Sequence, residues 1–302
     1  IETLETKKLT DINLKIKTDV DYILNNLKKC PLVIFNEFTN HQFSYNSSIK
    51  TKGDEFCDNL NKYLKKQIKD NLVLINLNKI FLSIGINKSI DKRFYYSFRS
   101  LYTTAFYYRY CEFILPYILS IKGKTKKAVI FDCDNTLWHG IIGEDGQENI
   151  LMNQDTYEGR IFSEVQNIIL NFISIGIIVG ICSKNNEIDI MNVIDNHPDM
   201  LLKRKHFSVI KANWQSKDKN ILDIANELNI GLDSIVFVDD SKFEIELVKN
   251  MIPEVHTLKV PEDLYKYPNT LINLTNIFLK NSITQEDIMR TQSYKEQMDR
   301  KN

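Results

Sequence analysis

The second half of this sequence alternates short apolar runs with longer amphipathic stretches. The apolar runs have the length of buried strands, and they lie at 128–131, 177–181, 207–210, 235–238 and 256–260. Between them, apolar residues recur with helical spacing at 156–175, 187–195, 217–228 and 242–249. Strands that read as continuous apolar runs are typical of a parallel sheet covered by helices on both faces. The pattern therefore predicts a doubly wound α/β domain.

A weaker pattern of the same kind occupies the beginning of the chain. Runs of strand length at 31–35 and 71–76 flank a stretch with helical spacing at 55–68. Strand, helix and strand in this order predict a small α/β unit with parallel strands. Residues 93–121 are rich in aromatic side chains, which we interpret as a large buried helix face that joins two domains. A role in nucleobase stacking is the alternative.

The division into domains follows from a change of composition. The segment 121–127 is basic, polar and contains a glycine, as linkers often are. We therefore expect an N-terminal α/β domain at 1–121, a second α/β domain at 122–280 and a helical tail at 281–302.

Composition excludes several classes of protein. Hydrophobic residues make up 43% and charged residues 26% of the chain, as in a globular protein. Lys plus Arg (39) equals Asp plus Glu (39), so no net charge favours nucleic acid or an anionic membrane. The five cysteines include no CxxC pair, which predicts neither a zinc site nor a disulfide framework and indicates the cytoplasm. The most apolar stretch, 113–121, is too short to span a bilayer.

Polar side chains follow four of the predicted strands. They are Asp132 and Asp134 after the first strand, Ser183 after the second, Lys217 at the helix after the third, and Asp239 with Asp240 after the fourth. Ligands of such sheets bind beyond the carboxyl ends of the strands. Each residue alone has a simpler explanation, such as a helix cap, a turn or a solvated charge. Their occurrence at four successive strand ends favours a shared site.

These residue types suit phosphoryl transfer. Asp132 would attack phosphorus, and Asp134 would protonate the leaving oxygen and later activate water. A carboxylate and a phosphate repel each other, so a cation is needed, and Mg²⁺ bound by oxygens of Asp132, Asp134, Asp239 and Asp240 would supply it. Ser183 would hydrogen-bond a phosphoryl oxygen, and Lys217 would neutralise charge in the transition state.

The four motifs resemble those of the haloacid dehalogenase (HAD) superfamily of phosphohydrolases and phosphotransferases. The resemblance implies that Asp132 is the nucleophile, Asp134 the acid/base and Asp239 the distal metal ligand, with Asp240 as a second candidate. It also implies that Ser183 and Lys217 bind phosphate. Thr136 matches the threonine that steadies the loop after the first strand, and we include it among the candidate substrate contacts.

A closer resemblance is to the FkbH-like branch of this superfamily. It rests on stretches at 134–146, 181–186, 214–221 and 238–244, and further on 91–95, 122–124 and 290–300. Members take a glyceryl group from a glycolytic acyl phosphate, remove phosphate and load the three-carbon unit onto the thiol of an acyl carrier protein. The resemblance implies an HAD-like sheet with a small flap, preceded by a smaller domain that resembles a degenerate SGNH hydrolase. No Gly-Asp-Ser nucleophile motif occurs in that part.

Three residues of the second domain have open roles. Cys182 matches a cysteine usual in the family and could carry the glyceryl unit as a thioester, or it could be a small buried strand residue. His139 stands where the family usually has glycine, so it could touch substrate at the flap base or be a tolerated exposed side chain. Asn185, in the second motif, is a further candidate substrate contact.

The expected substrate is a phosphorylated small molecule or acyl phosphate, with a carrier protein as a partner. The insert at 138–146 can form only a hairpin-like flap, and an open mouth suits a substrate presented on something large. Two other hypotheses remain: a plain phosphomonoesterase acting on a sugar phosphate or similar metabolite, and a scaffold with a fossil site. The intact acidic residues, serine and lysine argue against the scaffold.

Overall fold

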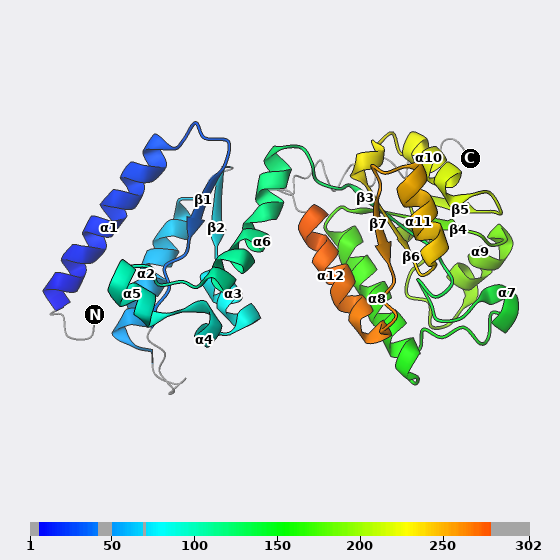
Figure 1. The fold of residues 1–302 in the computed structure, drawn as a ribbon, viewed down its shortest axis with the longest axis horizontal. Helices are drawn as coiled ribbons and strands as arrows, with labels where there is room; N and C mark the ends of the chain where they lie inside the picture. The colour runs from blue at the N-terminus through cyan, green and yellow to red at the C-terminus, as the bar shows by residue number, and fades with distance from the viewer. Residues whose placement is uncertain (1–5, 42–49, 69–70, 279–302) are drawn as a thin grey trace. The chain divides into compact units, whose positions relative to one another are not determined.

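The computed structural model describes residues 6–41, 50–68 and 71–278, and the chain forms two compact units (Figure 1). The first unit is Ile1–Lys122 and the second is Gly123–Asn302. The tail predicted at 281–302, with the family-like stretch at 290–300, lies outside the described residues. Within the described ranges, no helix combines the length and apolar character needed to cross a bilayer.

The second unit is built on a parallel sheet with the strand order β5-β4-β3-β6-β7. The strands are β3 (Ala128–Phe131), β4 (Ile178–Ser183), β5 (Val209–Ala212), β6 (Ile235–Asp239) and β7 (His256–Lys259). The doubly wound parallel sheet predicted from the sequence is therefore confirmed. β3 lies at the centre, and its last residue, Phe131, is in register with Ile181 of β4 and with Val238 of β6.

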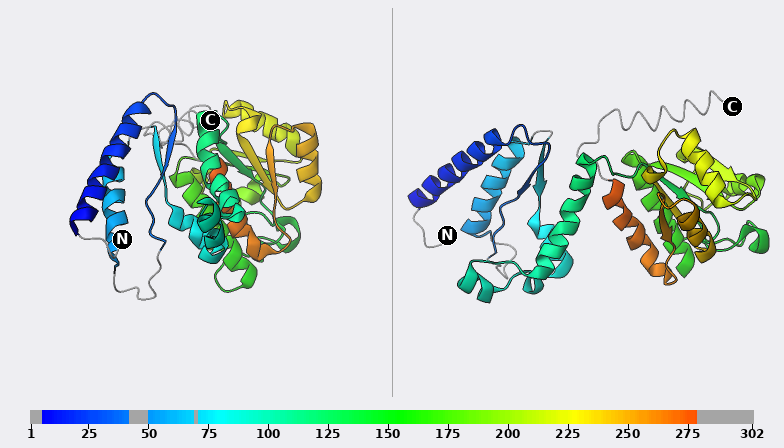
Figure 2. Two further views of the ribbon diagram at one scale, coloured as in Figure 1. Left: turned by 60° about the vertical axis from the view of Figure 1, so that its left-hand side comes forward. Right: turned by 45° about the horizontal axis from the view of Figure 1, so that its top comes forward.

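Helices cover both faces of this sheet, as Figures 1 and 2 show. They are α8 (Tyr157–Ser174), α9 (Glu187–Asn196), α10 (Lys217–Glu227), α11 (Lys242–Met251) and α12 (Tyr267–Phe278). α8 and α12 pack side by side, and their buried residues share one apolar cluster with Val129 and Phe131 of β3. The alternate residues of β3, Ala128 and Ile130, face a second cluster with α10 and α11. Burial on both faces explains why these strands read as continuous apolar runs.

Two strands extend further than the apolar pattern indicated. β4 continues through Cys182 to Ser183, and β5 reaches Ala212 rather than ending at 210. The reason is their pairing, because Cys182 is in register with Lys211 and Ser183 with Ala212. Polar residues are therefore held in the ladder by backbone hydrogen bonds, which hydrophobicity alone does not reveal.

The first unit contains two parallel strands, β1 (Val33–Asn36) and β2 (Leu72–Ile75). The connection between them carries α2 (Lys52–Lys66), which begins at a capping box of Thr51 and Asp54. The remaining helices are α1 (Thr6–Asn26), α3 (Leu77–Ile84), α4 (Ile86–Ser89), α5 (Lys92–Phe98) and α6 (Thr104–Ile121). The parallel strand–helix–strand unit is confirmed. That it is a degenerate SGNH-like domain stays a prediction.

The aromatic stretch 93–121 is not one buried helix face, so that interpretation is wrong in part. α5 buries none of its residues, and Tyr96 and Phe98 are 78% and 74% exposed. In α6, Phe106 is buried against Phe81 and Tyr102, whereas Tyr108 points outward. Aromatic residues at consecutive positions of a helix face different sides, so one apolar face cannot accommodate them all.

Candidate active site

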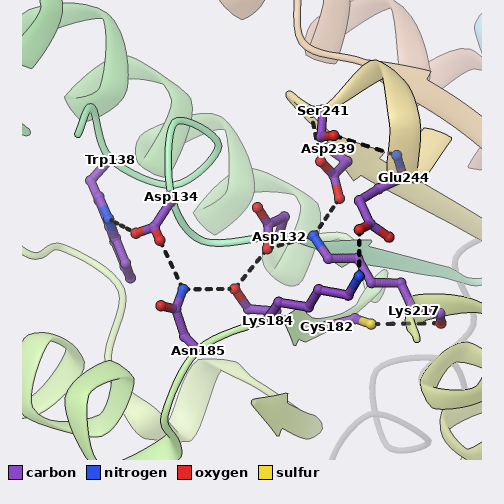
Figure 3. Close-up of polar contacts among 11 residues, drawn as sticks. Asp132, Asp134, Trp138, Cys182, Lys184, Asn185, Lys217, Asp239, Ser241 and Glu244 are labelled. Carbon is purple, nitrogen blue, oxygen red and sulfur yellow. Dashed lines mark hydrogen bonds and ion pairs between the residues drawn. The ribbon is translucent and has the colours of Figure 1, made fainter. Parts of the chain in front are cut away.

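The polar residues predicted from the sequence meet at the carboxyl edge of the sheet in the second unit (Figure 3). Asp132 follows β3 directly, Ser183 ends β4, and Asp239 ends β6. Lys217 is the first residue of α10, after β5. The parallel arrangement of β4, β3 and β6 places their ends side by side, as expected for a ligand site of this fold class.

Asp132 is held from two sides by donors. Ser183 Oγ donates a hydrogen bond to Asp132 Oδ1 at 2.7 Å, and Lys217 Nζ lies 2.9 Å from the same oxygen. The backbone N–H of Asp132 donates to Val238 O of β6 at 2.9 Å, which fixes the residue to the sheet. Only 6% of Asp132 is exposed, so this carboxylate is both ordered and shielded from bulk water.

Lys217 links the ends of β3 and β6. Its Nζ lies 2.5 Å from Asp239 Oδ2, and Asp239 Oδ1 accepts from the backbone N–H of Ser241 at 2.8 Å. Burial lowers the pKa of Lys217, but the carboxylates of Asp132 and Asp239 outweigh it and hold that pKa above its ordinary value. Lys217 is therefore an ammonium ion at neutral pH, aimed at the nucleophile candidate.

Three of the carboxylates form a group suited to a divalent cation. Asp132, Asp239 and Asp240 each offer one carboxylate oxygen, and these oxygens lie within 4.8 Å of one another. Burial, and after it the charge of Asp132, raises the pKa of both Asp239 and Asp240. Three carboxylates face one ammonium, so negative charge remains in excess. A hard cation such as Mg²⁺ fits this all-oxygen donor set.

The carboxylate of Asp134 points elsewhere, although we predicted it as a fourth metal ligand. Its Oδ1 accepts from the indole Nε1 of Trp138 at 3.0 Å and from the backbone N–H of Ile142 at 3.2 Å. Its Oδ2 accepts from Asn185 Nδ2 at 2.9 Å. The side chain is thus outside the group of three carboxylates, because the flap donors Trp138 and Ile142 and the Asn185 amide hold it.

Two further candidates sit beside this network in different ways. Asn185 Nδ2 also lies 3.1 Å from Ser183 Oγ, so the amide bridges the Asp134 carboxylate and the serine hydroxyl. Thr136 is fully buried, and its backbone O accepts from Tyr267 OH of α12 at 3.2 Å. Within the described part of the chain its Oγ1 has no hydrogen-bond partner. Its position suits the loop-steadying role better than contact with substrate.

The insert after β3 is a compact flap. His139 and Leu151 exchange two backbone hydrogen bonds, which close the segment as an antiparallel bridge around the one-turn helix α7 (Ile142–Asp145). The ring of His139 lies 6.1 Å from that of Phe162 in α8. His139 is therefore half-buried against α8 rather than free at the flap surface.

Cys182 lies under the site rather than in it. Its side chain is fully buried in the apolar cluster between the sheet and α10, and Sγ is 3.9 Å from the backbone O of Lys217. Burial raises the pKa of the Cys182 thiol to about 12. Because the thiolate is the nucleophilic form, this environment disfavours acylation of Cys182.

Two features of the site were not assigned from the sequence. Trp138 lies in the family-like stretch 134–146 and was not predicted to have a role, although its spacing of four residues from Asp134 is compatible with a contact across a turn. Lys184 Nζ pairs with Glu244 Oε1 at 2.7 Å, which joins the loop after β4 to the start of α11. Both partners are common surface residue types, so the sequence carried no signal for this pairing.

One protein of known structure is similar to this chain over most of its length. The N-terminal part of the protein BF1531 from Bacteroides fragilis, which contains a phosphatase domain and was solved in complex with Mg, is 30% identical to this chain with a TM-score of 0.76. The match covers 92% of this chain and 78% of that chain. This chain therefore belongs to one family with the phosphatase-containing N-terminal part of BF1531.

Other solved structures are more distant. The wild-type HAD family enzyme from Bacteroides thetaiotaomicron, in complex with magnesium and inorganic phosphate, is 12% identical with a TM-score of 0.32, over 44% of this chain and 93% of that chain. The HAD domain of the effector Lem4 from Legionella pneumophila is 14% identical with a TM-score of 0.37, over 51% and 95%. No protein-family model matches the sequence, and a search of the curated proteins found no match either.

Proposed function

We propose that the second unit is a Mg²⁺-dependent phosphohydrolase that works through an aspartyl-phosphate on Asp132. The observation that carries this proposal is the placement of Asp132 Oδ1 between Ser183 Oγ (2.7 Å) and Lys217 Nζ (2.9 Å), beside the carboxylates of Asp239 and Asp240. The resemblance of the four motifs to those of the HAD superfamily and a relative with a phosphatase domain solved in complex with Mg support it.

The chemistry divides between two aspartates. Asp132 attacks phosphorus, while Asp134 gives a proton to the leaving oxygen as its bond to phosphorus breaks. Ser183 Oγ and Lys217 Nζ then bind non-bridging oxygens of the phosphoryl group and balance its charge. In the second half, Asp134 takes a proton from a water that attacks phosphorus and frees Asp132. Bound Mg²⁺, held by Asp132, Asp239 and Asp240, supplies positive charge that offsets the repulsion between carboxylate and phosphate.

The first test is direct. The purified chain is incubated with a panel of phosphate esters and acyl phosphates, with Mg²⁺ or with a chelator, and released phosphate is measured. We expect Mg²⁺-dependent release that Asp132→Asn removes. Release that is unaffected by Asp132→Asn would show that the nucleophile is misassigned.

We further propose that the substrate is the glycolytic acyl phosphate 1,3-bisphosphoglycerate. Asp132 removes its ester phosphate, and a carrier-protein thiol attacks the acyl carbon and displaces the acyl phosphate as inorganic phosphate, which loads the three-carbon unit onto the carrier. The FkbH-like motifs around Asp134, Ser183, Lys217 and Asp239 support this. So does the small flap, because an insert as short as 138–146 forms no lid domain, which suits a substrate presented on a large carrier. The burial of Cys182 favours direct transfer to the carrier thiol over a thioester on this chain.

A plain phosphomonoesterase is the second candidate, because the described side chains suffice for hydrolysis without a partner. The two are separated by incubating the chain with Mg²⁺ and 1,3-bisphosphoglycerate, with and without a carrier protein, and weighing the carrier by mass spectrometry. A three-carbon adduct on the carrier supports transfer. Rapid hydrolysis of one small ester, together with no adduct on any carrier, would establish the phosphomonoesterase instead.

A further inference from the structure

Trp138 places its one polar atom on the acid/base candidate. The side chain is fully buried at the base of the flap, and its only polar atom, Nε1, donates to Asp134 Oδ1 at 3.0 Å. A buried indole N–H needs a partner, since an unsatisfied donor costs free energy. Here the partner is the carboxylate that the chemistry requires, so packing of the ring and orientation of Asp134 depend on each other.

The flap adds a second donor to the same oxygen. The backbone N–H of Ile142, the first residue of α7, donates to Asp134 Oδ1 at 3.2 Å. A carboxylate oxygen has about two acceptor sites, so Oδ1 is filled by Trp138 and Ile142. Oδ1 is therefore tied to the flap and has no site left for a substrate or a water.

Oδ2 faces the other way. It accepts from Asn185 Nδ2 at 2.9 Å, and this nitrogen lies 3.1 Å from Ser183 Oγ, which in turn donates to Asp132 Oδ1. Trp138, Asp134, Asn185 and Asp132 of this line of contacts are labelled in Figure 3, and the Ser183 hydroxyl joins Asn185 to Asp132. Oδ2 is thus the oxygen on the nucleophile's side, and among the described residues only Asn185 donates to it, which leaves one acceptor site open.

We infer that Trp138 is a positioning residue, which with the Ile142 N–H and Asn185 fixes the Asp134 carboxylate so that Oδ2 is the oxygen that transfers the proton. The inference rests on the proposed phosphohydrolase function. Asp134 bears the proton on Oδ2 and gives it to the leaving oxygen as the bond from that oxygen to phosphorus breaks. In the second half, Oδ2 takes the proton from the attacking water, which restores the starting state.

If Trp138 positions the acid, the loss of kcat/KM on removing its indole N–H should depend on the leaving group of the substrate. An alkyl phosphate releases a strongly basic alkoxide and needs the acid, whereas p-nitrophenyl phosphate releases a stable anion and scarcely needs it. The value of kcat/KM reports the steps up to formation of the aspartyl-phosphate, so later hydrolysis does not obscure the comparison. A misplaced acid therefore lowers kcat/KM for alkyl phosphates selectively, while general damage lowers it equally for all substrates.

The test compares Trp138→Phe with the wild-type chain over a series of alkyl and aryl phosphates, in saturating Mg²⁺. We expect kcat/KM to fall roughly 10- to 100-fold for alkyl phosphates and less than about 3-fold for p-nitrophenyl phosphate. Asn185→Ala removes the donor to Oδ2 and should likewise lower kcat/KM more for alkyl phosphates than for p-nitrophenyl phosphate. Trp214→Phe is the matched control, because Trp214 is 70% exposed and its Nε1 donates to Asn186 instead.

A crystal structure of each variant gives a second readout that does not require activity. We expect the Asp134 side chain to leave its wild-type rotamer, or to occupy more than one, when Trp138 is Phe. An unchanged Asp134 rotamer, or an equal fall in kcat/KM for every leaving group, would overturn the inference while leaving the phosphohydrolase assignment intact. A wild-type chain that hydrolyses no phosphate compound would instead refute the proposed function. The Asp134 rotamer in the crystal structures of the wild-type chain and Trp138→Phe would still test whether Trp138 positions Asp134.

Discussion

Lys217 Nζ lies 2.5 Å from Asp239 Oδ2, and both side chains are almost entirely buried. The pair ties the first residue of α10 to the last residue of β6, and Asp132 approaches the same ammonium. A buried charge is strongly destabilising without a partner of opposite charge, so the ammonium of Lys217 and the carboxylates offset each other's cost of burial. The site is consequently also a structural element of the second unit.

Replacing Lys217 with Met should therefore affect stability as well as activity. Loss of the ammonium leaves Asp132 and Asp239 buried without compensation, and the free energy of unfolding should fall by about 3–5 kcal/mol. Mg²⁺ should restore part of this loss, because it binds only the folded site. Denaturant unfolding with and without Mg²⁺ measures both effects. Lys219→Met, at an exposed position of the same helix, should change neither the free energy of unfolding nor its dependence on Mg²⁺. A Lys217→Met variant with the wild-type free energy of unfolding would contradict the paired-charge description.

Replacing Asp240 should weaken the response of activity to Mg²⁺, whereas replacing an exposed acidic residue should not. Asp240 belongs to the group of three carboxylates, so Asp240→Asn should raise the Mg²⁺ concentration for half-maximal phosphate release by roughly 10- to 100-fold. Asp223→Asn, at an exposed position of α10, should leave the Mg²⁺ titration unchanged. Equal titration curves for Asp240→Asn and the wild-type chain would remove Asp240 from the metal site.

Removal of the metal should abolish phosphate release. A chelator in excess removes the cation that offsets the negative charge of Asp132, Asp239 and Asp240, and added Mg²⁺ should restore activity fully. The measurement is phosphate release before chelation, after it and after Mg²⁺ is returned. Calcium, which is larger and prefers more ligands, should restore less activity. Full activity in chelator would contradict a metal-dependent mechanism.

The close packing of β4 gives a prediction about stability alone. A Cβ atom added at Gly180 would lie 2.7 Å from Val209 Cγ1 and 2.8 Å from Ile130 Cδ1, so Gly180→Ala should destabilise by about 1–3 kcal/mol. Gly143 in α7 has nothing within 4 Å of such an atom, and Gly143→Ala should be close to neutral. Equal unfolding midpoints for both variants would mean that the sheet adjusts without cost.

The cysteines should differ in reactivity with iodoacetamide. Burial raises the pKa of Cys182 to about 12, so well below that pH its thiol is protonated, and it is also inaccessible. Cys111 is exposed. Mass spectrometry after brief alkylation of the folded chain at pH 8 should find label on Cys111 and almost none on Cys182. Rapid labelling of Cys182 would revive its role as an acyl carrier.

The sequence was informative where one physical requirement dominates. The strands of the second unit are buried on both faces, so their apolar runs located them in the sequence. The positions of the acidic residues, the serine and the lysine just after these strands then predicted that they lie together. What lay beyond the sequence was side-chain direction. Asp134 and Asp132 are two residues apart, yet only contacts with Trp138 and Asn185 determine which way Asp134 points. Likewise, the aromatic residues of α5 resemble core residues in sequence, but within the described part of the chain none of them is buried.

The order of the strands in the sheet has a consequence for biosynthesis. β3 is central, but its neighbour β6 comes last of the three strands that carry the site, after β4 and β5 have been made. Asp132 therefore emerges from the ribosome well before Asp239, its partner through Lys217. Contacts so distant in sequence form late, because the intervening chain must first be ordered. A nascent chain that ends before β6 carries Asp132 without Asp239 and Asp240, so the proposed activity would appear only when synthesis of the sheet is nearly complete.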